Sequence, residues 1–155
     1  KSIRLNFEEV QAAMLHGCHL LRPREVTGFD NSFVPSIGRE FMSMLGLKMV
    51  EWDELECCGA SLAGINDELS LQLLNKRCDS VRRTEAEFII PFCTYCFLQF
   101  DKKQTFNGDK IIPVILPSQL LAMCLGRKKE VINLVGNESV TQKIEANLLS
   151  RLIEV

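Results

Sequence analysis

The sequence predicts an α/β fold, in which a small parallel sheet is flanked by helices and the cysteine loops lie at one sheet edge. Short apolar runs alternate along the chain with helical patterns, which is the order found in parallel α/β domains. Most of the cysteines also follow directly after an expected strand. With 155 residues, the chain (residues 1–155) has the length of a single domain.

The first half of the chain contains two expected strands and one helix. Residues 10–15 are apolar and fit either a short strand or the end of a helix. Residues 33–45 carry apolar side chains at helical spacing, and Gly46 is placed to end that helix as a C-terminal cap. Residues 47–52 alternate in polarity, which indicates a strand.

The second half continues the alternation. Asn66 is a suitable N-cap for a helix over residues 67–83. Residues 88–90 form a continuous apolar run, which is typical of a buried parallel strand. We expect further helices over residues 96–103, 118–125 and 138–153, another short strand over residues 113–116, and a surface turn at residues 107–109.

Composition excludes several classes of protein. Hydrophobic residues make up 46% and charged residues 25% of the chain, as in ordinary globular domains. Lys and Arg number 18 against 20 Asp and Glu, so no basic excess favours a nucleic-acid partner. No apolar stretch reaches the roughly 20 residues needed to span a membrane. We therefore expect a cytoplasmic protein without a membrane span of its own.

The seven cysteines are the most informative feature. Their odd number and two tight clusters, Cys57-Cys58 and Cys93-Thr94-Tyr95-Cys96, match a secreted disulfide framework poorly. In a reducing compartment, such clusters indicate metal binding or redox chemistry. Ligand sites of parallel sheets lie beyond the carboxyl ends of the strands. The three cysteine-bearing loops, which include Cys18, are therefore expected to converge.

The spacing of these cysteines suits a shared metal. Cys93 and Cys96 lie three positions apart, so on a first helical turn both thiolates can face one ion. Helix dipoles there favour anionic sulfur. Vicinal Cys57 and Cys58 both reach one centre only in an irregular turn, which Gly59 permits. The alternative is that Cys93 and Cys96 are buried core cysteines, which are common.

The motifs around these cysteines resemble the cysteine-rich CCG domain of the heterodisulfide reductase B-subunit family, over about residues 14–126. The matching segments are His16-Gly17-Cys18-His19-Leu20-Leu21-Arg22-Pro23, Gly28-Phe29-Asp30, Glu56-Cys57-Cys58-Gly59-Ala60, Pro91-Phe92-Cys93-Thr94-Tyr95-Cys96-Phe97-Leu98-Gln99-Phe100-Asp101 and residues 113–126. The resemblance is to the C-terminal of two tandem modules. Since the chain starts at Lys1 without Met, we expect a fragment of a two-module subunit.

The resemblance implies that a non-cubane 4Fe-4S cluster is bound by Cys18, Cys57, Cys58, Cys93 and Cys96. Zinc, which some modules of this kind hold, is the alternative and needs only four of these ligands. The implied reaction is disulfide reduction. In the mechanism that the resemblance implies, the cluster would supply electrons one at a time and would hold one sulfur of the opened disulfide between the two transfers.

Candidate catalytic groups flank Cys18. His16 and His19 could protonate a leaving thiolate near neutral pH, or could simply hydrogen-bond to backbone. Arg22 and Arg24 could steer an anionic substrate, or could be solvated loop residues. The implied partners are iron–sulfur and flavin subunits of the same redox complex and a disulfide or quinone-linked electron carrier.

Three other functions compete with this interpretation. Similar CCG subunits of succinate dehydrogenase E-type and methylmenaquinol:fumarate reductase complexes pass electrons between a quinol and partner subunits. A zinc-stabilised docking module would do no chemistry. A thioredoxin-like enzyme would leave Cys18 and the vicinal pair unexplained. Cys78 and Cys124 lie outside the motif and are expected to be core or surface thiols.

Overall fold

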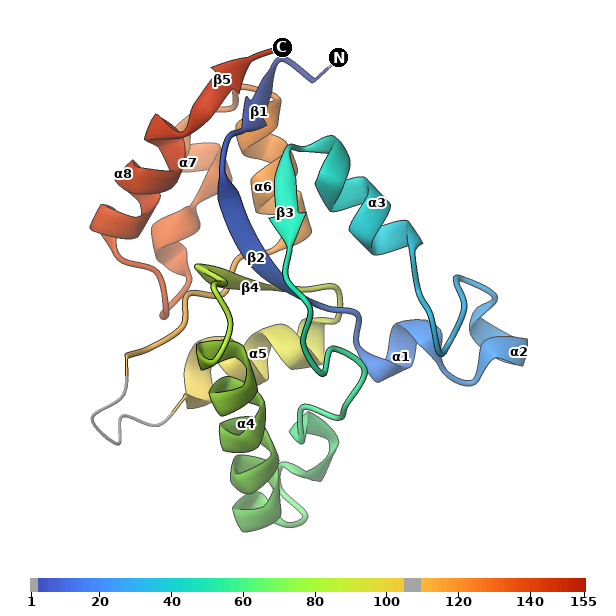
Figure 1. Ribbon diagram of the computed structural model, residues 1–155. Coiled ribbons are helices and arrows are strands. Elements are labelled where there is room, and N and C mark those ends of the chain that lie inside the picture. The colour runs from blue at the N-terminus through green and yellow to red at the C-terminus, as the bar shows by residue number, and fades with distance from the viewer. Residues whose placement is uncertain (1–2, 105–109) are drawn as a thin grey trace.

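The centre of the protein is a three-stranded parallel sheet in the order β3-β2-β4 (Figure 1). A computed structural model describes residues 3–104 and 110–155, so the turn expected at residues 107–109 lies outside the described residues. The strands are β2 (Val10–Leu15), β3 (Leu47–Met49) and β4 (Phe88–Pro91). Since both neighbours pair with β2 in parallel, all three carboxyl ends share one edge. The predicted fold class is confirmed.

Both faces of this sheet are buried, which is why its strands are almost entirely apolar. Ala12 on β2 and Phe88 on β4 belong to one core, whereas Ala13 and Ile89, the next residue on each strand, belong to the other. This alternation follows from the two-residue period of a strand. The first core is covered by α3 (Ile37–Met44), α6 (Pro117–Cys124), α7 (Lys129–Ile132) and α8 (Gln142–Ser150), and the second by α4 (Asp67–Arg82) and α5 (Thr94–Lys103).

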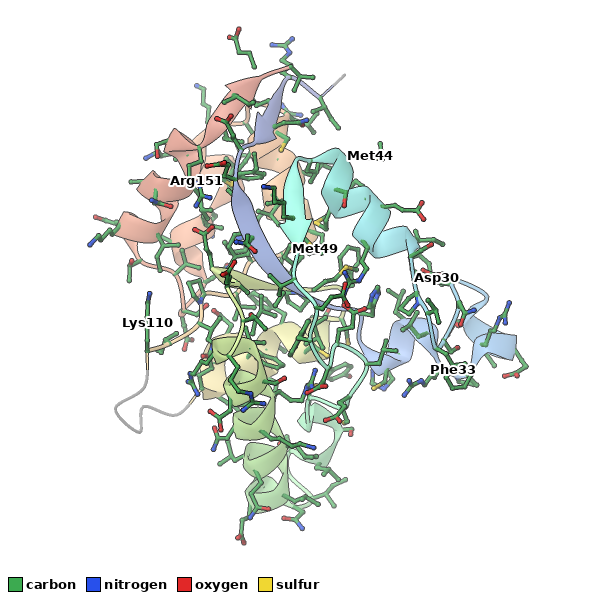
Figure 2. The ribbon with its side chains drawn as sticks, viewed as in Figure 1. Asp30, Phe33, Met44, Met49, Lys110 and Arg151 are labelled. Carbon is green, nitrogen blue, oxygen red and sulfur yellow. The ribbon has the colours of Figure 1, made fainter. Side chains whose placement is uncertain are left out.

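Short helical turns complete the chain. They are α1 (Cys18–Leu21), α2 (Arg24–Thr27) and the 3-10 turns η1 (Ala60–Leu62) and η2 (Leu134–Gly136). The segment that leads into α3 carries Asp30 and Phe33 and runs between α3 and the short helices α1 and α2 (Figure 2). The carboxylate of Asp30 accepts hydrogen bonds from the backbone N–H groups of Ser36 and Ile37, each at 2.8 Å. The helix predicted from residue 33 therefore begins only at Ile37.

The predicted boundaries of α4 hold. The Asn66 side chain accepts a hydrogen bond from the N–H of Leu69 at 3.0 Å, so the predicted N-cap is confirmed. Gly46 has φ +84° and follows α3 as predicted. By contrast, the strand expected over residues 47–52 ends at Met49, because the chain then leaves the sheet.

Two predictions near the C-terminus are wrong in part. The strand expected over residues 113–116 is a single bridge between Val114 and Ile89, where Pro113 has no N–H to extend the ladder. The helix expected over residues 138–153 is confined to α8, because Thr141 caps its start and the chain extends after Ser150. The following strand β5 (Leu152–Glu154) pairs antiparallel with β1 (Leu5–Phe7), a pairing that sequence patterns did not indicate.

Candidate metal centre

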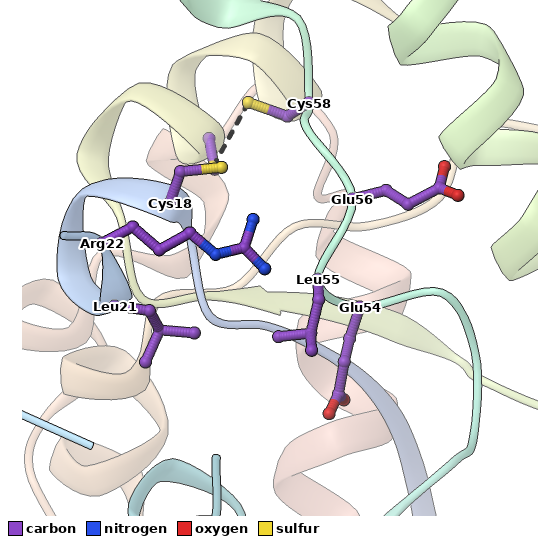
Figure 3. Close-up of a pocket in the computed structure, with 9 residues that line it drawn as sticks. Cys18, Leu21, Arg22, Glu54, Leu55, Glu56 and Cys58 are labelled. Atoms are coloured by element: carbon purple, nitrogen blue, oxygen red, sulfur yellow. Dashed lines mark hydrogen bonds between the residues drawn. The ribbon is translucent and has the colours of Figure 1, made fainter. Parts of the chain in front are cut away.

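A small pocket lies at the carboxyl edge of the sheet (Figure 3). Its volume is about 10 Å³, which is room for about one water molecule. The pocket is bounded by α1 and the turn before it, by the loop between β3 and η1, and by α5. Arg22 extends toward the segment that carries Glu54 and Glu56. The lining residues are Gly17, Cys18, Leu21, Arg22, Glu54, Leu55, Glu56, Cys58 and Cys96.

The five predicted cysteines are linked by contacts at this edge. The Sγ atoms of Cys58 and Cys96 are 3.3 Å apart, although 38 positions separate the residues. Cys18 interacts with Cys57 and Cys58, and Cys93 interacts with Cys96. Cys58 and Cys96 are buried, Cys18 and Cys93 are half-buried, and Cys57 is exposed. The expected convergence of the three loops is therefore observed, and the ligand role of these residues stays a prediction.

Two glycines allow this convergence. Gly17 has φ +81°, and a Cβ atom there would lie 2.3 Å from the Cβ of Cys93. Gly59 has φ +82°, and a Cβ atom there would lie 2.5 Å from the carbonyl oxygen of Ser70 on α4. A larger residue would strain the backbone at either position. At Gly17 it would also push the Cys18 loop away from Cys93, and at Gly59 it would push the loop of the vicinal cysteines away from α4.

Contacts among the thiols separate their acidities. The Cys96 thiol donates a hydrogen bond to the sulfur of Cys58, which lowers the pKa of Cys58 to about 6 against the opposing effect of burial. The same bond and burial raise the pKa of Cys96 far above its usual range. Burial, with the neighbouring Cys57, raises the pKa of Cys18. Among Cys18, Cys58 and Cys96, the sulfur most readily present as a thiolate is therefore that of Cys58, and the thiolate is the form that binds metals.

The two candidate catalytic histidines are in different environments, and neither lines the pocket. His16 is completely buried, and its Nε2 lies 3.5 Å from a carboxylate oxygen of Glu54. Burial raises the pKa of Glu54, but His16 and the Arg39 guanidinium outweigh it, so the net shift is downward. His19 is exposed, and its ring packs edge-on against Tyr95 with centroids 5.6 Å apart. A catalytic role for His16 or His19 stays a prediction.

Residues 12–101, more than half of the chain, match the family profile of the CCG cysteine-rich domain. The chain belongs to the CCG family. Its resemblance to the heterodisulfide reductase B-subunit family is also supported by curated relatives. The chain is 31% identical to the B subunit of ferredoxin:CoB-CoM heterodisulfide reductase of Methanosarcina mazei, over 95% of this chain and 50% of that protein.

Two further relatives indicate the range of the family. A protein of Archaeoglobus profundus that is named as similar to the heterodisulfide reductase B subunit is 30% identical, over 99% of this chain and 53% of the relative. The 8-methylmenaquinol:fumarate reductase membrane anchor subunit of Wolinella succinogenes is 25% identical, over 87% of this chain and 50% of the relative. The chain thus spans about half the length of the curated relatives it matches. Among its described residues, no helix is long and apolar enough to cross a bilayer.

The donor chemistry of the pocket suits a soft metal or an iron–sulfur cluster, both of which bind thiolates. Within residues 3–104 and 110–155, no three His, Cys, Asp or Glu side chains are already spaced to hold a single ion. The fit therefore rests on the set of thiols and on the pocket that Cys18, Cys58 and Cys96 line. Cys78 and Cys124 lie in the two cores instead, where burial raises the pKa of each to about 11. Both are core thiols, as expected.

Sequence patterns did not single out Arg77 as part of this region. Only 1% of its surface is exposed, and its guanidinium stacks on Trp52 at 4.3 Å from the ring centroid. An arginine usually indicates a solvated position. The available signal was its place three residues after Leu74, on the buried side of the helix.

Proposed function

We propose that this CCG domain is a module of a heterodisulfide reductase-like oxidoreductase that binds an iron–sulfur cluster and takes part in electron transfer to a disulfide. The proposed ligands are Cys18, Cys57, Cys58, Cys93 and Cys96. The observation that carries the proposal is that three of these thiols, Cys18, Cys58 and Cys96, come from separate segments and line one pocket, while Cys57 interacts with Cys18 and Cys93 with Cys96. The relatives named as heterodisulfide reductase subunits support the same class of chemistry.

When bound, the cluster would supply one-electron transfer to a disulfide substrate. The protein's own residues would shape access and charge. Arg22 is exposed at the mouth of the pocket and attracts anions, while its Nη2 atom lies 3.4 Å from the carbonyl oxygen of Ser32. His19, next to Cys18 and open to solvent, is the proposed proton donor to a leaving thiolate. His16, enclosed beside Glu54, would act only through that carboxylate.

The deciding experiment measures iron, acid-labile sulfide and zinc in anaerobically purified protein, together with the EPR spectrum of the thiol-oxidised state. We expect about four iron and four sulfide per chain, with a paramagnetic oxidised signal. One zinc per chain without a signal would instead favour the zinc-stabilised docking module, and the catalytic roles would be withdrawn.

Cysteine variants test the proposed ligand set. Cys57→Ala and Cys58→Ala should each abolish the cluster spectrum, because all five sulfurs are assigned as ligands. Cys78→Ala and Cys124→Ala are matched controls, since both thiols are buried away from the pocket. A wild-type spectrum in either vicinal variant would contradict ligation by five cysteines.

A second candidate function is electron transfer between a quinol and partner subunits, which the fumarate reductase relative favours. In either case we propose iron–sulfur and flavin subunits as partners, and any membrane contact would occur through them. Assays of the reconstituted protein with a disulfide substrate and, separately, with a reduced quinone distinguish the two candidate functions. Oxidation of a reduced quinone without disulfide reduction would favour the second.

A further inference from the structure

The Arg77 side chain occupies an unusual position between α4 and the loop that carries the vicinal cysteines. It is almost fully buried, and it projects from the middle of α4. One face of its guanidinium covers the ring of Trp52, whose Nε1 in turn donates to the carbonyl oxygen of Met14 on β2 at 2.7 Å. Arg77 and Trp52 together thus connect α4, the loop after β3 and strand β2.

Arg77 also contacts the cysteine loop on the N-terminal side of Cys57. Its Nη2 donates to the carbonyl oxygen of Asp53. Its Nη1 lies 3.5 Å from the carboxylate of Glu56 and 3.9 Å from that of Asp53. The loop is therefore attached to α4 before the cysteine pair begins.

A second attachment follows the pair. The hydroxyl of Ser70 on α4 donates to the carbonyl oxygen of Gly59 at 2.9 Å. The side-chain amide of Gln99, one turn after Cys96 on α5, donates to the same hydroxyl at 2.9 Å. Ser70 and Gln99 hold the far end of the loop, whereas Arg77 holds the near end together with Ser80, whose hydroxyl donates to the Asp53 carboxylate at 2.8 Å. Among these α4 side chains, Arg77 is the one that bonds to the main chain of the near end.

The Arg77 guanidinium has more N–H donors than there are acceptor atoms around it. Its Nε and Nη1 atoms have no hydrogen-bond partner among the described residues, and the two carboxylates beside it are half or more exposed. An arginine keeps its charge under all ordinary conditions. A buried charge with only partial compensation acts strongly on nearby groups, and Arg77 interacts electrostatically with Cys58.

We propose that Arg77 is a positioning residue of the metal centre, which holds the Cys57–Cys58 loop in place and keeps a positive charge beside the sulfur ligands. The charge stabilises the reduced, more negative state of a bound cluster and so raises its reduction potential. This inference rests on the proposed function for its effect on potential. Its effect on the loop is independent of any metal.

The test compares Arg77→Met and Arg77→Lys with Lys76→Met as the matched control. Lys76 lies next to Arg77, pairs with Glu56 at 3.3 Å and carries the same charge, but its side chain is 66% exposed. Methionine has a similar length and no charge, and the carboxylates of Asp53 and Glu56 that it leaves unpaired are half or more exposed, so both stay hydrated. Circular dichroism checks the fold of each variant.

Hydrogen exchange of the metal-free protein is the first measurement. In Arg77→Met we expect residues 53–59 to exchange about tenfold faster than in wild type, because the contacts of Arg77 with the Asp53 carbonyl oxygen and with Glu56 are lost. Lys76→Met should leave this exchange unchanged. Equal protection in Arg77→Met and wild type would overturn the positioning role. This result decides the role even if the wild-type protein takes up no cluster, an outcome that would refute the proposed function alone.

The reduction potential of the loaded protein is the second measurement. In Arg77→Met we expect the reduction equilibrium to fall about tenfold relative to Lys76→Met, which is about 59 mV for one electron. Arg77→Lys keeps the charge and loses the planar guanidinium. Its reduction potential should therefore equal that of wild type, whereas its residues 53–59 should exchange as fast as in Arg77→Met. A potential in Arg77→Met equal to that of the control would overturn the electrostatic role.

Discussion

At Gly17, one methyl group decides whether two of the cysteine loops can meet. We expect Gly17→Ala to destabilise the protein by about 2–4 kcal/mol, because the positive φ costs about 1–2 kcal/mol and the contact with Cys93 adds a steric cost. The variant should also lose its metal. Urea unfolding and metal content measure both effects.

Gly28→Ala is the control for this variant. Gly28 also has a positive φ, of +55°, but a Cβ atom there would meet nothing within 4 Å. Gly28→Ala should therefore lower the free energy of unfolding only by the backbone strain, about 1–2 kcal/mol, and should retain the proposed metal. Equal effects of the two substitutions would contradict the importance of the contact between Gly17 and Cys93.

Thiol reactivity offers another test at single residues. In metal-free protein at pH 7, we expect iodoacetamide to modify exposed Cys57 and to leave Cys78 and Cys124 untouched. Burial raises the pKa of both core thiols to about 11, so only about one molecule in ten thousand carries the reactive thiolate. Mass spectrometry of peptides locates the label. Modification of Cys78 as fast as Cys57 would show that the second core is open.

Individual site residues were predictable from sequence to unequal degrees. The cysteines carry a spacing that few other functions require, so their convergence could be expected before the fold was known. Arg77 and Glu54 carry no such signal, because a charged residue in a helix or loop is usually solvated. Their roles arise only when β3, α4 and the loop between them pack together.

Among the elements, α3 depends on a distant cap. The Asp30 carboxylate accepts hydrogen bonds from the N–H groups of Ile37, Asn31 and Ser36, which outweigh burial and lower its pKa below 3.8. Asp30→Ala should therefore cost about 1 kcal/mol at pH 7. Chemical unfolding of both proteins at several pH values measures the difference.

The pH dependence has a defined direction. Because the pKa of Asp30 is lower in the folded than in the unfolded chain, its contribution is fully present above about pH 3.8 and is lost as the pH falls through the folded-state pKa. Asp30→Asn keeps an acceptor oxygen and should lack this dependence. A difference between wild type and Asp30→Ala that persists unchanged at the lowest pH would contradict the assignment.

Elements were predictable wherever a long pattern existed. The buried strands and α4 have apolar runs or caps that depend on local sequence alone. The start of α3 was misplaced because apolar Phe33 fits the helical spacing, whereas the Asn31 side chain accepts hydrogen bonds from the N–H groups of Phe33 and Val34 and holds them in a turn. The pairing of β1 with β5 joins two three-residue segments at opposite ends of the chain, which no local pattern can indicate.

At the scale of the whole molecule, Arg151 joins the C-terminal strand to the central sheet. Its guanidinium donates to the carbonyl oxygens of Glu8 and Glu9 and pairs with the carboxylate of Glu87 at 2.5 Å. Arg151→Ala should lower the free energy of unfolding by about 1–2 kcal/mol. Metal content should be unchanged, because the cysteines lie at the other edge of the sheet. Thermal unfolding measures the loss of stability, and Lys143→Ala, at an exposed position on α8, is the control. Loss of metal in Arg151→Ala would show that the two edges are coupled.

The paired strands β1 and β5 bring the two ends of the described chain together, on the side of the sheet opposite to the cysteine loops (Figure 1). A tether at either end would therefore orient the protein in the same way on a solid support. Immobilised on a resin or an electrode by an N-terminal or a C-terminal tag, the domain would present its cysteine pocket to the solution. The two attachments should be interchangeable in any assay of access to that pocket.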